Sequence, residues 1–365
     1  MYSNITNIWW QQVSDAVFMI NRLTDCLTDE RSIALVLPEH TPWYSFLVNQ
    51  IEENLHNNNS DNSFCIIDVS LISSENPGKY IAGKYCLAPK LSHYWPGESY
   101  ARFLAKSNDI MLNNQYLWIK GLDSENYKNW YDFVNEYIEC CDKNEKRASF
   151  ILEYRDADNT VSMKSPFFDT VCWNEVIKPY DYYMFSSLMV SSLSCCDEIK
   201  HYIAELIYTI SGNDAELCAY LAEYGENFAE NPSDTLYKCI SDSRRSDGSE
   251  FSVPDINFID TAIKETQIKK VFPVIERFRN RFITENYNQL DYFLNSSSVE
   301  NTRGESISEP YELEIGTLKF ISGSKNFAIS EKQKNELGFI HNARNRLAHN
   351  KILSYNEVRD ILNIM

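Results

Sequence analysis

The first half of the chain alternates short runs of β-branched and aromatic residues with longer stretches in which apolar residues recur every three or four positions. The short runs are typical of buried strands, and the longer stretches are typical of amphipathic helices. We expect strands at 32–37, 64–69, 116–120 and 148–154, with a further one before Pro179. We expect helices between them at 41–55, 98–113 and 125–141. This alternation predicts an α/β fold with a mostly parallel sheet flanked by helices.

The next region, residues 181–240, shows only the helical period. Its apolar residues recur at three and four positions, as in 196–211 and 214–229, which more often indicates a packed core than a ligand-binding face. The stretch 241–250 is rich in Ser, Asp, Gly and Arg, a composition typical of a linker. The pattern therefore predicts three parts: an α/β domain at 1–180, a helical extension with a linker at 181–254 and an all-α helical domain at 255–365.

The predicted C-terminal domain begins with a long amphipathic pattern. It is clearest at 269–283 and predicts one helix that continues to Leu294. A polar segment, 295–310, then interrupts the helices and is either a plain surface loop or a flap over a binding cleft.

The last two helices have clear start signals. Ser330 with Gln333, and Ser354 with Glu357, have the spacing of capping boxes, in which two side chains satisfy the free N–H groups at a helix start. A motif that lies between these two signals is therefore carried by the penultimate helix of the chain.

Composition places the chain among globular proteins and limits what it binds. Its 365 residues are 44% hydrophobic and 13% aromatic, which is enough for two or three domains with cores of their own. The net charge is −18 and the sequence pI is about 4.8. Because phosphate neutralisation dominates general nucleic-acid binding, the chain is not a general nucleic-acid coat. Any RNA site must be a local cluster of basic residues.

Cysteine usage and hydropathy bear on the compartment. The ten cysteines include the adjacent pairs 140–141 and 195–196, but no Cys-x-x-Cys spacing with partner histidines, so neither a zinc site nor a disulfide framework is indicated. We expect no metal and no other cofactor. The N-terminus lacks a charged leader, and the chain has no run of about eighteen apolar residues. We therefore expect a cytoplasmic protein without a membrane partner.

The strongest chemical pattern lies near the C-terminus, where Arg344 and Asn345 are followed after three residues by His349. On a helix Asn345 and His349 share a face, and His341 lies one turn earlier. Histidine can move a proton, and a guanidinium can bind phosphorane oxygens through paired hydrogen bonds. This combination suits cleavage of RNA by its own 2′-hydroxyl without a metal ion. The alternative is an ordinary polar helix face in solvent.

This spacing of Arg344, Asn345 and His349 resembles the signature of the HEPN superfamily, whose nucleases carry Arg, a polar residue and His at the start of a late helix in a small helical bundle. The resemblance covers residues 255–365. It implies that Arg344 stabilises the scissile phosphate, that His349 is the acid or base and that Asn345 orients them. It also implies a homodimer whose two motifs face one cleft, and products that end in a cyclic phosphate. Some members have lost catalysis and only bind nucleotides or partners.

A group of basic residues accompanies the motif and forms the predicted RNA-binding surface. Its members are Lys269, Lys270, Arg277, Arg281, Arg346 and Lys351. Lys264 and Arg279 lie in the same stretch. RNA is the expected partner because such cations attract its phosphates. The alternative is that a basic helix in an acidic protein docks onto an acidic surface, either of another protein or of this one.

The layout of the first domain resembles P-loop ATPases of the STAND and AAA+ type, but the residues that carry their chemistry are missing. Where the Walker A pattern has glycines, Lys and then Ser or Thr, residues 38–45 have no glycine, Tyr44 stands at the lysine position, and only Ser45 fits. Ahead of Asp123, Lys120 stands where a magnesium-orienting Asp is expected, and a lysine repels the metal.

The degenerate nucleotide site would thus comprise Tyr44, Ser45, Lys120 and Asp123. We expect a pseudo-ATPase and not an active ATPase. The alternative is that the sheet belongs to another α/β family and that the alignment is a coincidence.

These patterns lead to one expected function and one competitor. The first is a metal-independent endoribonuclease acting as a toxin or anti-phage effector, a setting that the HEPN resemblance implies, with a pseudo-ATPase domain that binds a regulator or partner protein. The second is a non-catalytic interaction subunit of a defence or ATPase complex, favoured by the acidic charge and the missing ATPase residues. Trp9–Trp10 and Tyr94–Trp95 could anchor a partner, although core packing is the commoner explanation.

Overall fold

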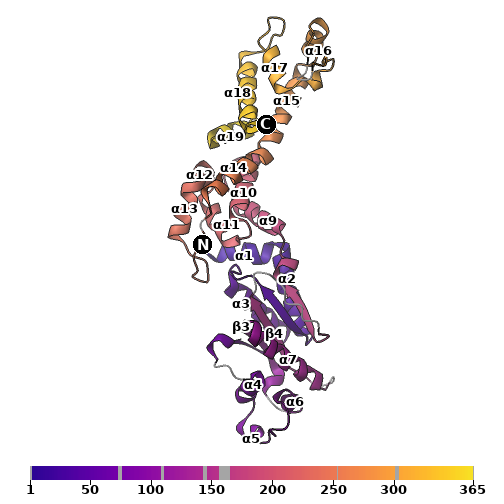
Figure 1. Cartoon of the computed structure of the whole chain (residues 1–365), viewed down its shortest axis with the longest axis vertical. Helices are drawn as coiled ribbons and strands as arrows, with labels where there is room; N and C mark the ends of the chain where they lie inside the picture. The colour runs from indigo at the N-terminus through magenta and orange to yellow at the C-terminus, as the bar shows by residue number, and fades with distance from the viewer. Residues whose placement is uncertain are drawn as a thin grey trace. The chain divides into compact units, whose positions relative to one another are not determined.

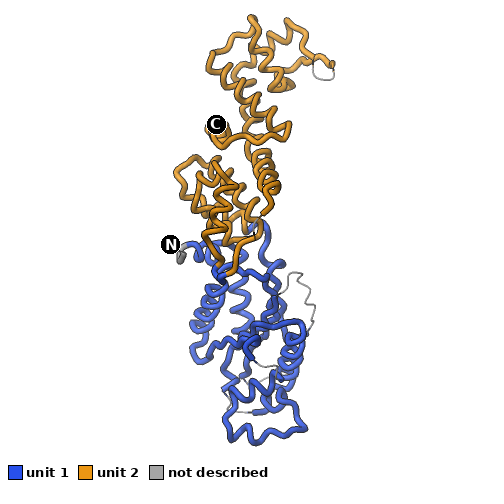
Figure 2. The backbone as a smooth tube through the Cα atoms, turned by 60° about the vertical axis from the view of Figure 1, so that its left-hand side comes forward, with its two compact units in different colours: residues 1–181, 246–248 blue, residues 182–245, 249–365 orange. Residues whose placement is uncertain are grey.

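The computed structural model describes residues 2–72, 76–107, 111–142, 146–155, 165–252, 254–300 and 304–364. The chain forms two compact units (Figure 2). Unit 1 comprises residues 1–181 and 246–248, and unit 2 comprises residues 182–245 and 249–365. Both predicted helical segments therefore contribute to the same unit.

Unit 1 is built on a parallel sheet. Its strands are β1 (Ser32–Leu37), β2 (Ser63–Asp68), β3 (Gln115–Leu122), β4 (Ser149–Arg155) and β5 (Phe168–Cys172). In the described residues they form a five-stranded sheet of order β2-β3-β4-β1-β5, in which every neighbouring pair is parallel. The predicted strands and the α/β class are thus confirmed. β1 lies inside the sheet and is buried at all six positions, so its residues after Ser32 are all apolar.

Helices flank this sheet (Figure 1). They are α1 (Tyr2–Gln12), α2 (Ser14–Thr28), α3 (Tyr44–Asn58), α4 (Pro77–Tyr85), α5 (Ala88–Leu91), α6 (Tyr100–Ala105), α7 (Ser124–Cys140) and α8 (Trp173–Val176), with 3-10 turns η1 (Val69–Leu71) and η2 (Met111–Asn114). Apolar side chains of β3 and β4, among them Leu117 and Phe150, share one core with α4, α6 and α7. α2 contacts β1, and α3 contacts β2. Burial against these helices keeps the strands apolar.

The structure changes one helix prediction in unit 1 and adds helices that were not predicted. The helix expected at 98–113 is shorter, because α6 ends at Ala105 and a separate 3-10 turn follows at Met111–Asn114. The hydrophobic pattern also missed α4 and α5, which lie between β2 and α6. Both have a proline in the first turn, and the Asn76 side chain caps α4. Helix α5, with four residues, has a start signal but no repeating apolar face, whereas α4 buries Ile81, Ala82 and Tyr85 on one side.

Unit 2 is built from helices. They are α9 (Pro179–Val190), which contains the boundary between the units, α10 (Asp197–Ser211), α11 (Ala215–Tyr224), α12 (Glu226–Glu230), α13 (Pro232–Asp242), α14 (Ile256–Lys270), α15 (Phe272–Glu285), α16 (Tyr287–Ser296), α17 (Ile315–Ile321), α18 (Glu331–Ala348) and α19 (Tyr355–Leu362), with a 3-10 turn at Pro310–Glu312. The predicted helix at 196–211 is confirmed. The one at 214–229 is divided at Gly225, whose φ of 52° ends α11.

The long helix predicted from residue 269 to Leu294 is wrong as a single element. The chain is helical there, but breaks at Val271 and Asn286 divide it into α14, α15 and α16. Pro273 lies in the first turn of α15. A proline inside a continuous helix would remove a hydrogen bond and clash with the carbonyl one turn earlier, so the chain ends one helix and starts another.

A buried glutamine holds α14 to the loop before α19. The Gln267 side chain is 1% exposed. It donates a hydrogen bond to the carbonyl of Leu353 and accepts one from the N–H of Leu353, both at 2.9 Å. This exchange satisfies both backbone groups of a buried loop residue. It fixes the loop that follows α18.

We expect Gln267→Leu to destabilise unit 2 by about 2–4 kcal/mol, because it leaves a buried N–H and a buried C=O of Leu353 without partners. Urea unfolding followed by circular dichroism measures the change. Gln289→Leu is the matched control, since Gln289 is exposed on α16 of the same unit. The control should change the free energy of unfolding by less than about 0.5 kcal/mol. Equal stability of the two variants would contradict this role of Gln267.

Candidate functional site

Helix α18 carries the predicted catalytic motif, and local sequence sets its start. Ser330 Oγ accepts a hydrogen bond from the N–H of Gln333, and the Gln333 side chain accepts one from the N–H of Ser330. This confirms the first capping box, and Ser354 with Glu357 confirms the second at the start of α19. The buried residues of α18 recur at helical spacing: Leu337, Ile340, Ala343 and Leu347.

The three motif residues lie at the C-terminal end of α18. Arg344 and Asn345 are half-buried in its last turn, and His349 is an exposed residue directly after Ala348. The N–H of His349 donates to the carbonyl of Asn345 at 3.1 Å, so the helical spacing of these two residues is kept. The HEPN resemblance implies a motif at the start of a helix, whereas this one lies at the end. A helix end carries partial negative charge, so side chains must supply the attraction for a phosphate.

Asn345 has a partner that sequence reasoning did not assign to it. Its Nδ2 atom lies 3.0 Å from Nε2 of His341, one turn earlier on α18. The resemblance implies that Asn345 orients Arg344 and His349, but in the structure its amide is bonded to His341. The spacing of four residues was the available signal for this pair. His341 therefore joins the candidate site.

The side chains of Arg344 and His349 have no hydrogen-bond or ion-pair partner within the ranges that the structure describes. The chain has 52 acidic and 34 basic Lys and Arg side chains, so a carboxylate partner for an arginine is easily found. An arginine without one keeps its planar fork of donors for a ligand, and this fork matches two phosphate oxygens.

Two predicted RNA-binding lysines are instead held by the protein. Lys269 and Lys270 on α14 both pair with Glu205 of α10, which is 2% exposed, and Lys270 Nζ lies 3.0 Å from Glu205 Oε2. Lys270 also donates to the hydroxyl of Tyr183 at 3.2 Å. Burial alone would lower the pKa of Lys270, but hydrogen bonds with Glu205 and Tyr183 raise it above its usual range, so the ammonium stays charged.

The predicted RNA-binding arginines of α15 are engaged in a similar way. Arg277 binds Glu198 of α10 at 2.9 Å. Arg281 donates to the carbonyl of Ile364 at 3.0 Å. These contacts agree with the alternative in which basic residues dock onto the acidic surface of the same protein. RNA binding by these residues stays a prediction.

Arg346 fixes the loop that follows the motif. Its guanidinium binds Glu357 Oε1 of α19 and the carbonyl of Ile352, both at 2.5 Å. Partial burial would raise the pKa of Glu357, but hydrogen bonds from Ser354 and the charge of Arg346 hold that pKa below its usual range. Lys351 of the same loop is exposed, and its ammonium has no partner among the described residues.

A second candidate site lies in unit 1 at the carboxyl ends of the strands and is centred on Glu153. This carboxylate is 2% exposed. It accepts hydrogen bonds from the Tyr44 hydroxyl at 2.5 Å, from Trp118 Nε1 at 2.7 Å and from Arg155 Nε at 2.9 Å. The Arg155 guanidinium also lies 4.8 Å from the centroid of the Tyr44 ring. Burial and the charge of Glu153 raise the pKa of Tyr44, so its phenol stays neutral.

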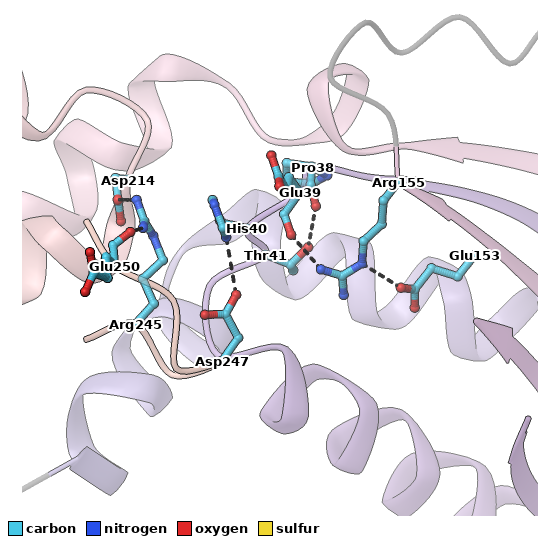
Figure 3. Close-up of polar contacts among 10 residues, drawn as sticks. All are labelled: Pro38, Glu39, His40, Thr41, Glu153, Arg155, Asp214, Arg245, Asp247 and Glu250. Atoms are coloured by element: carbon cyan, nitrogen blue, oxygen red, sulfur yellow. Dashed lines mark hydrogen bonds and ion pairs between the residues drawn. The ribbon is translucent and has the colours of Figure 1, made fainter. Parts of the chain in front are cut away.

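The loop after β1 has its carbonyls occupied by donors of the protein. Figure 3 shows Arg155 between Glu153 and this loop, where its Nη1 donates to the carbonyl of Glu39 at 2.6 Å. The hydroxyl of Thr41 donates to the carbonyl of Pro38 at 3.3 Å. A phosphate-binding loop needs glycines and N–H groups directed at the ligand. This loop has no glycine, and Arg155 of β4 holds it through a hydrogen bond to the carbonyl of Glu39.

Of the predicted degenerate nucleotide residues, Tyr44 and Lys120 come together and the other two do not. Tyr44 and Lys120 line a cavity of about 290 Å³. Its other lining residues are Asp68, Ser70, Gly121, Leu122, Glu153 and Arg155. Lys120 Nζ lies 3.4 Å from Asp68 Oδ2. Asp123 is the N-cap of α7, and Ser45 is exposed on α3 outside the cavity lining.

Sequence reasoning missed Glu153 and Arg155 at this edge. The available signal was a pair of charges at alternate positions of a strand that is otherwise apolar. They lie at a point where the strand order reverses. β1 and β4 are neighbours, but the chain runs from β1 to β2 at one edge of the sheet and from β4 to β5 at the other edge. Open α/β sheets bind ligands outside the carboxyl ends of strands at such a point.

No protein-family model matches this chain, and no curated protein matches it either. Of the helices that the structure describes, none combines the length and apolar character needed to span a bilayer. Among the same residues, no three His, Cys, Asp or Glu side chains gather in a way that could hold a metal ion. The roles of individual residues therefore rest on their geometry and chemistry.

We expect acid to weaken the connection between α18 and α19. The folded pKa of Glu357 lies below its ordinary value of 4.5, so its contacts contribute stability above that pH, and this contribution is lost as the pH falls through the folded pKa. The free energy of unfolding should fall below pH 4.5 in the wild type, and fall less steeply in Glu357→Gln.

Urea unfolding at a series of pH values from about 3 to about 7 measures this dependence. Glu331→Gln is the matched control because Glu331, on α18, is 81% exposed and its partner among the described residues is the nearby Lys334. The control should keep the wild-type pH dependence. The same steep loss in Glu357→Gln as in the wild type would reject a contribution from Glu357.

Proposed function

We propose that this protein is a metal-independent endoribonuclease of the HEPN type, with Arg344, Asn345 and His349 in its active site. One observation supports the proposal above the others. Arg344 and His349 are both at the C-terminal end of α18, and their side chains have no partners among the described residues, while other cations of unit 2 such as Lys270 are held by carboxylates. A guanidinium and an imidazole that the fold does not use are available to a phosphodiester.

In this proposal His349 and Arg344 divide the chemistry. His349 takes the proton of the 2′-hydroxyl, the 2′-oxygen bonds to phosphorus, and the bond from phosphorus to the 5′-oxygen breaks, which leaves a 2′,3′-cyclic phosphate. Arg344 donates paired hydrogen bonds to the non-bridging oxygens, whose negative charge grows in the phosphorane. The same histidine of a second protomer protonates the leaving 5′-oxygen. A homodimer in which two motifs share one cleft is therefore part of the proposal.

The other residues near the motif have positioning roles. The amide of Asn345, bonded to His341, fixes side chains on the face of α18 that includes the motif. Arg346 holds the following loop through Glu357 and the carbonyl of Ile352. Lys351 of this loop is exposed and is the best placed of the predicted RNA-binding residues to attract a phosphate.

For unit 1 we propose a regulatory role without ATP hydrolysis. Its parallel sheet is compatible with a P-loop-like layout, but the loop after β1 lacks glycine and is tied to Arg155. The cavity at this edge is lined by Lys120 and Arg155 and by the carboxylates of Asp68 and Glu153, so its charges balance. A triphosphate needs excess positive charge. We infer that this unit binds a partner protein, in the toxin or anti-phage setting that the HEPN resemblance implies.

A non-catalytic interaction subunit is the second candidate function. The pairing of Lys269 and Lys270 with Glu205, and of Arg277 with Glu198, favours it because these contacts compete with RNA phosphates. The net charge of −18 acts in the same direction. In this case Arg344 would bind a carboxylate of a partner protein.

We expect the wild-type protein to cut labelled total RNA in the presence of EDTA. Arg344→Ala and His349→Ala should each lower the rate by at least about 100-fold, the usual size for loss of a general acid–base group or of a donor that stabilises charge. Arg344→Lys should recover only part of the rate, because an ammonium keeps the charge but not the planar pair of donors. Gel electrophoresis measures cleavage, and end-group analysis identifies the cyclic phosphate.

His56→Ala is the matched control, since His56 is exposed on α3 of unit 1 and should be dispensable for cleavage. Light scattering on the same samples measures the oligomeric state. No cleavage by folded wild-type protein, alone or with the products of neighbouring genes, would move the assignment to the interaction subunit. Cleavage by a strict monomer would reject the cleft shared by two protomers.

We expect ATP with Mg²⁺ to leave the thermal unfolding temperature of the wild type unchanged. A ligand present at one hundred times its Kd adds about 2.7 kcal/mol to the stability of the folded state, which a thermal shift assay detects readily. Tyr44→Lys should also show no shift, because the lysine is restored while the loop still lacks glycine. A clear rise in unfolding temperature for the wild type would contradict the pseudo-ATPase assignment.

A further inference from the structure

Residues 76–107 of unit 1, which contain α4, α5 and α6, have a charge opposite to that of the chain as a whole. They carry five Lys and Arg residues, namely Lys79, Lys84, Lys90, Arg102 and Lys106, and one carboxylate, Glu98. The whole chain has a net charge of −18. The same segment holds Tyr80, Tyr85, Tyr94, Trp95, Tyr100 and Phe103. Basic residues interleaved with aromatic ones are typical of surfaces that bind single-stranded nucleic acid.

A cavity of about 520 Å³ opens within this segment, and we call it the α4–α6 pocket. Its lining residues are Lys79, Tyr80, Gly83, Lys84, Leu91, Tyr94 and Tyr100. The lining therefore combines three aromatic rings with two cations and contains no carboxylate. A cavity of this size lies within the range of small-ligand sites and is large enough for one nucleotide.

The aromatic wall of the pocket is held rigidly. The rings of Tyr94 and Tyr100 stack with centroids 4.0 Å apart and an interplanar angle of 7°. Phe103 packs edge-on against Tyr94, with centroids 5.5 Å apart. The Tyr94 hydroxyl donates to the carbonyl of Glu98 at 2.9 Å. A platform that is fixed in advance loses little side-chain entropy when a base stacks on it.

The two lysines of the pocket are exposed on α4. Lys84 Nζ donates to the sulfur atom of Cys65 at 3.2 Å, and the ammonium also lies 5.5 Å from the centroid of the Tyr85 ring. No carboxylate takes up its charge in these contacts, in contrast to Lys269 and Lys270, which share Glu205. The open side of α4 at Gly83 leaves access, because a Cβ there would meet nothing within 4 Å.

We propose that the α4–α6 pocket binds single-stranded RNA, with an unpaired base on the tyrosine wall and its flanking phosphates on Lys79 and Lys84. The choice of RNA among anionic polymers rests on the ribonuclease function proposed for unit 2. The aromatic wall favours RNA over an acidic protein segment, because a nucleobase has a flat face to stack and an acidic side chain has none. A base inside a duplex has both faces covered by its stacked neighbours, so we expect the pocket to bind duplex RNA more weakly than a single strand.

A neighbouring acidic cavity sets the path of the strand. It measures about 790 Å³, and Tyr100 lines both this cavity and the α4–α6 pocket. Its lining includes Asp123, Glu125, Asp132 and Glu136, which repel phosphates. The strand therefore leaves the pocket on the side of α4 and its lysines.

The test uses a fluorescein-labelled single strand of twelve nucleotides that carries a 2′-O-methyl group on every ribose. This probe cannot be cut through a 2′-hydroxyl, so fluorescence anisotropy measures binding alone. We expect Lys79→Glu/Lys84→Glu to weaken binding at least about tenfold, and to reduce the slope of log K against log salt by about 1.4, the value for two phosphates of a single strand. Lys128→Glu/Lys238→Glu is the matched control, because it makes the same charge change at two exposed lysines outside the pocket.

The contribution of stacking is tested at Tyr94. Tyr94→Leu should weaken binding by about 5- to 140-fold, the range that corresponds to the loss of one base stack. Tyr94→Phe loses the hydrogen bond to the carbonyl of Glu98 but keeps the ring and its stacking on Tyr100, so it should bind much more tightly than Tyr94→Leu and close to the wild type. Circular dichroism and thermal unfolding of each variant establish that it is folded.

Three results would overturn the inference. The first is equal binding by the lysine variant and its charge-matched control. The second is binding of an RNA duplex as tight as that of the single strand. The third is displacement of the probe by polyglutamate at the same concentration of anionic groups as by unlabelled RNA. The last would assign the pocket to an acidic protein partner. Arg344→Ala/His349→Ala should still bind the probe. If the wild type binds the probe but does not cut RNA, the nuclease proposal is rejected and the pocket proposal stands. If the wild type cuts RNA and the pocket variants bind the probe as tightly as the wild type, the pocket proposal is rejected and the nuclease proposal stands.

Discussion

The arrangement of unit 2 depends on one buried carboxylate, that of Glu205 on α10. It binds Lys269 and Lys270 of α14, so helices on either side of residues 246–248 pack as one unit. A carboxylate buried without such partners would cost several kcal/mol, so these lysines are required by the fold. The same contacts withdraw two cations from any RNA. Arg344 differs from them because no carboxylate in the described residues holds it, and this difference is the physical basis for placing chemistry at the end of α18.

Glu153 has a comparable role in unit 1. It gathers Tyr44, Trp118 and Arg155 at the carboxyl ends of the strands, and Arg155 extends this network to the loop after β1. The hydrogen-bond donors of Tyr44, Trp118 and Arg155, which a bound phosphate would need, thus already bind acceptors of the protein. In the sheet of unit 1 and on the basic helix α14, the cations that suggest a ligand site are therefore largely paired with buried carboxylates of the protein itself, namely Glu153 and Glu205. What remains open is the motif on α18 and the α4–α6 pocket, where Lys84 is exposed and donates to the sulfur of Cys65 and not to a carboxylate.

The parts of the fold that were predictable are those with short-range causes. The strand at 32–37 is apolar because both of its faces are covered, and the capping box at Ser330 needs only a residue three positions later. The errors arise where a residue such as proline interrupts a helix although the apolar period continues, or where a helix is too short to show a period. The apolar pattern of 269–294 continues through Pro273, but the backbone cannot, so α14 ends at Lys270 and α15 begins at Phe272. A second break, at Asn286, separates α15 from α16. Helix α5 was missed because a helix of four residues has no apolar period to read.

For the candidate site, the sequence alone proposed Arg344, Asn345 and His349 and predicted the start of the helix that leads to them, because a motif that spans six residues is a matter of local spacing. It could not show that Asn345 would bond to His341, or that Lys269 would meet Glu205, 64 positions away. The spacing of residues in the sequence predicts which side chains share one face of a helix. It does not predict which faces of different helices pack against each other. Ion pairing between distant residues follows from how helices pack and how burial penalises a lone charge, so only the tertiary structure decided which cations are committed to the fold and which are left for a ligand.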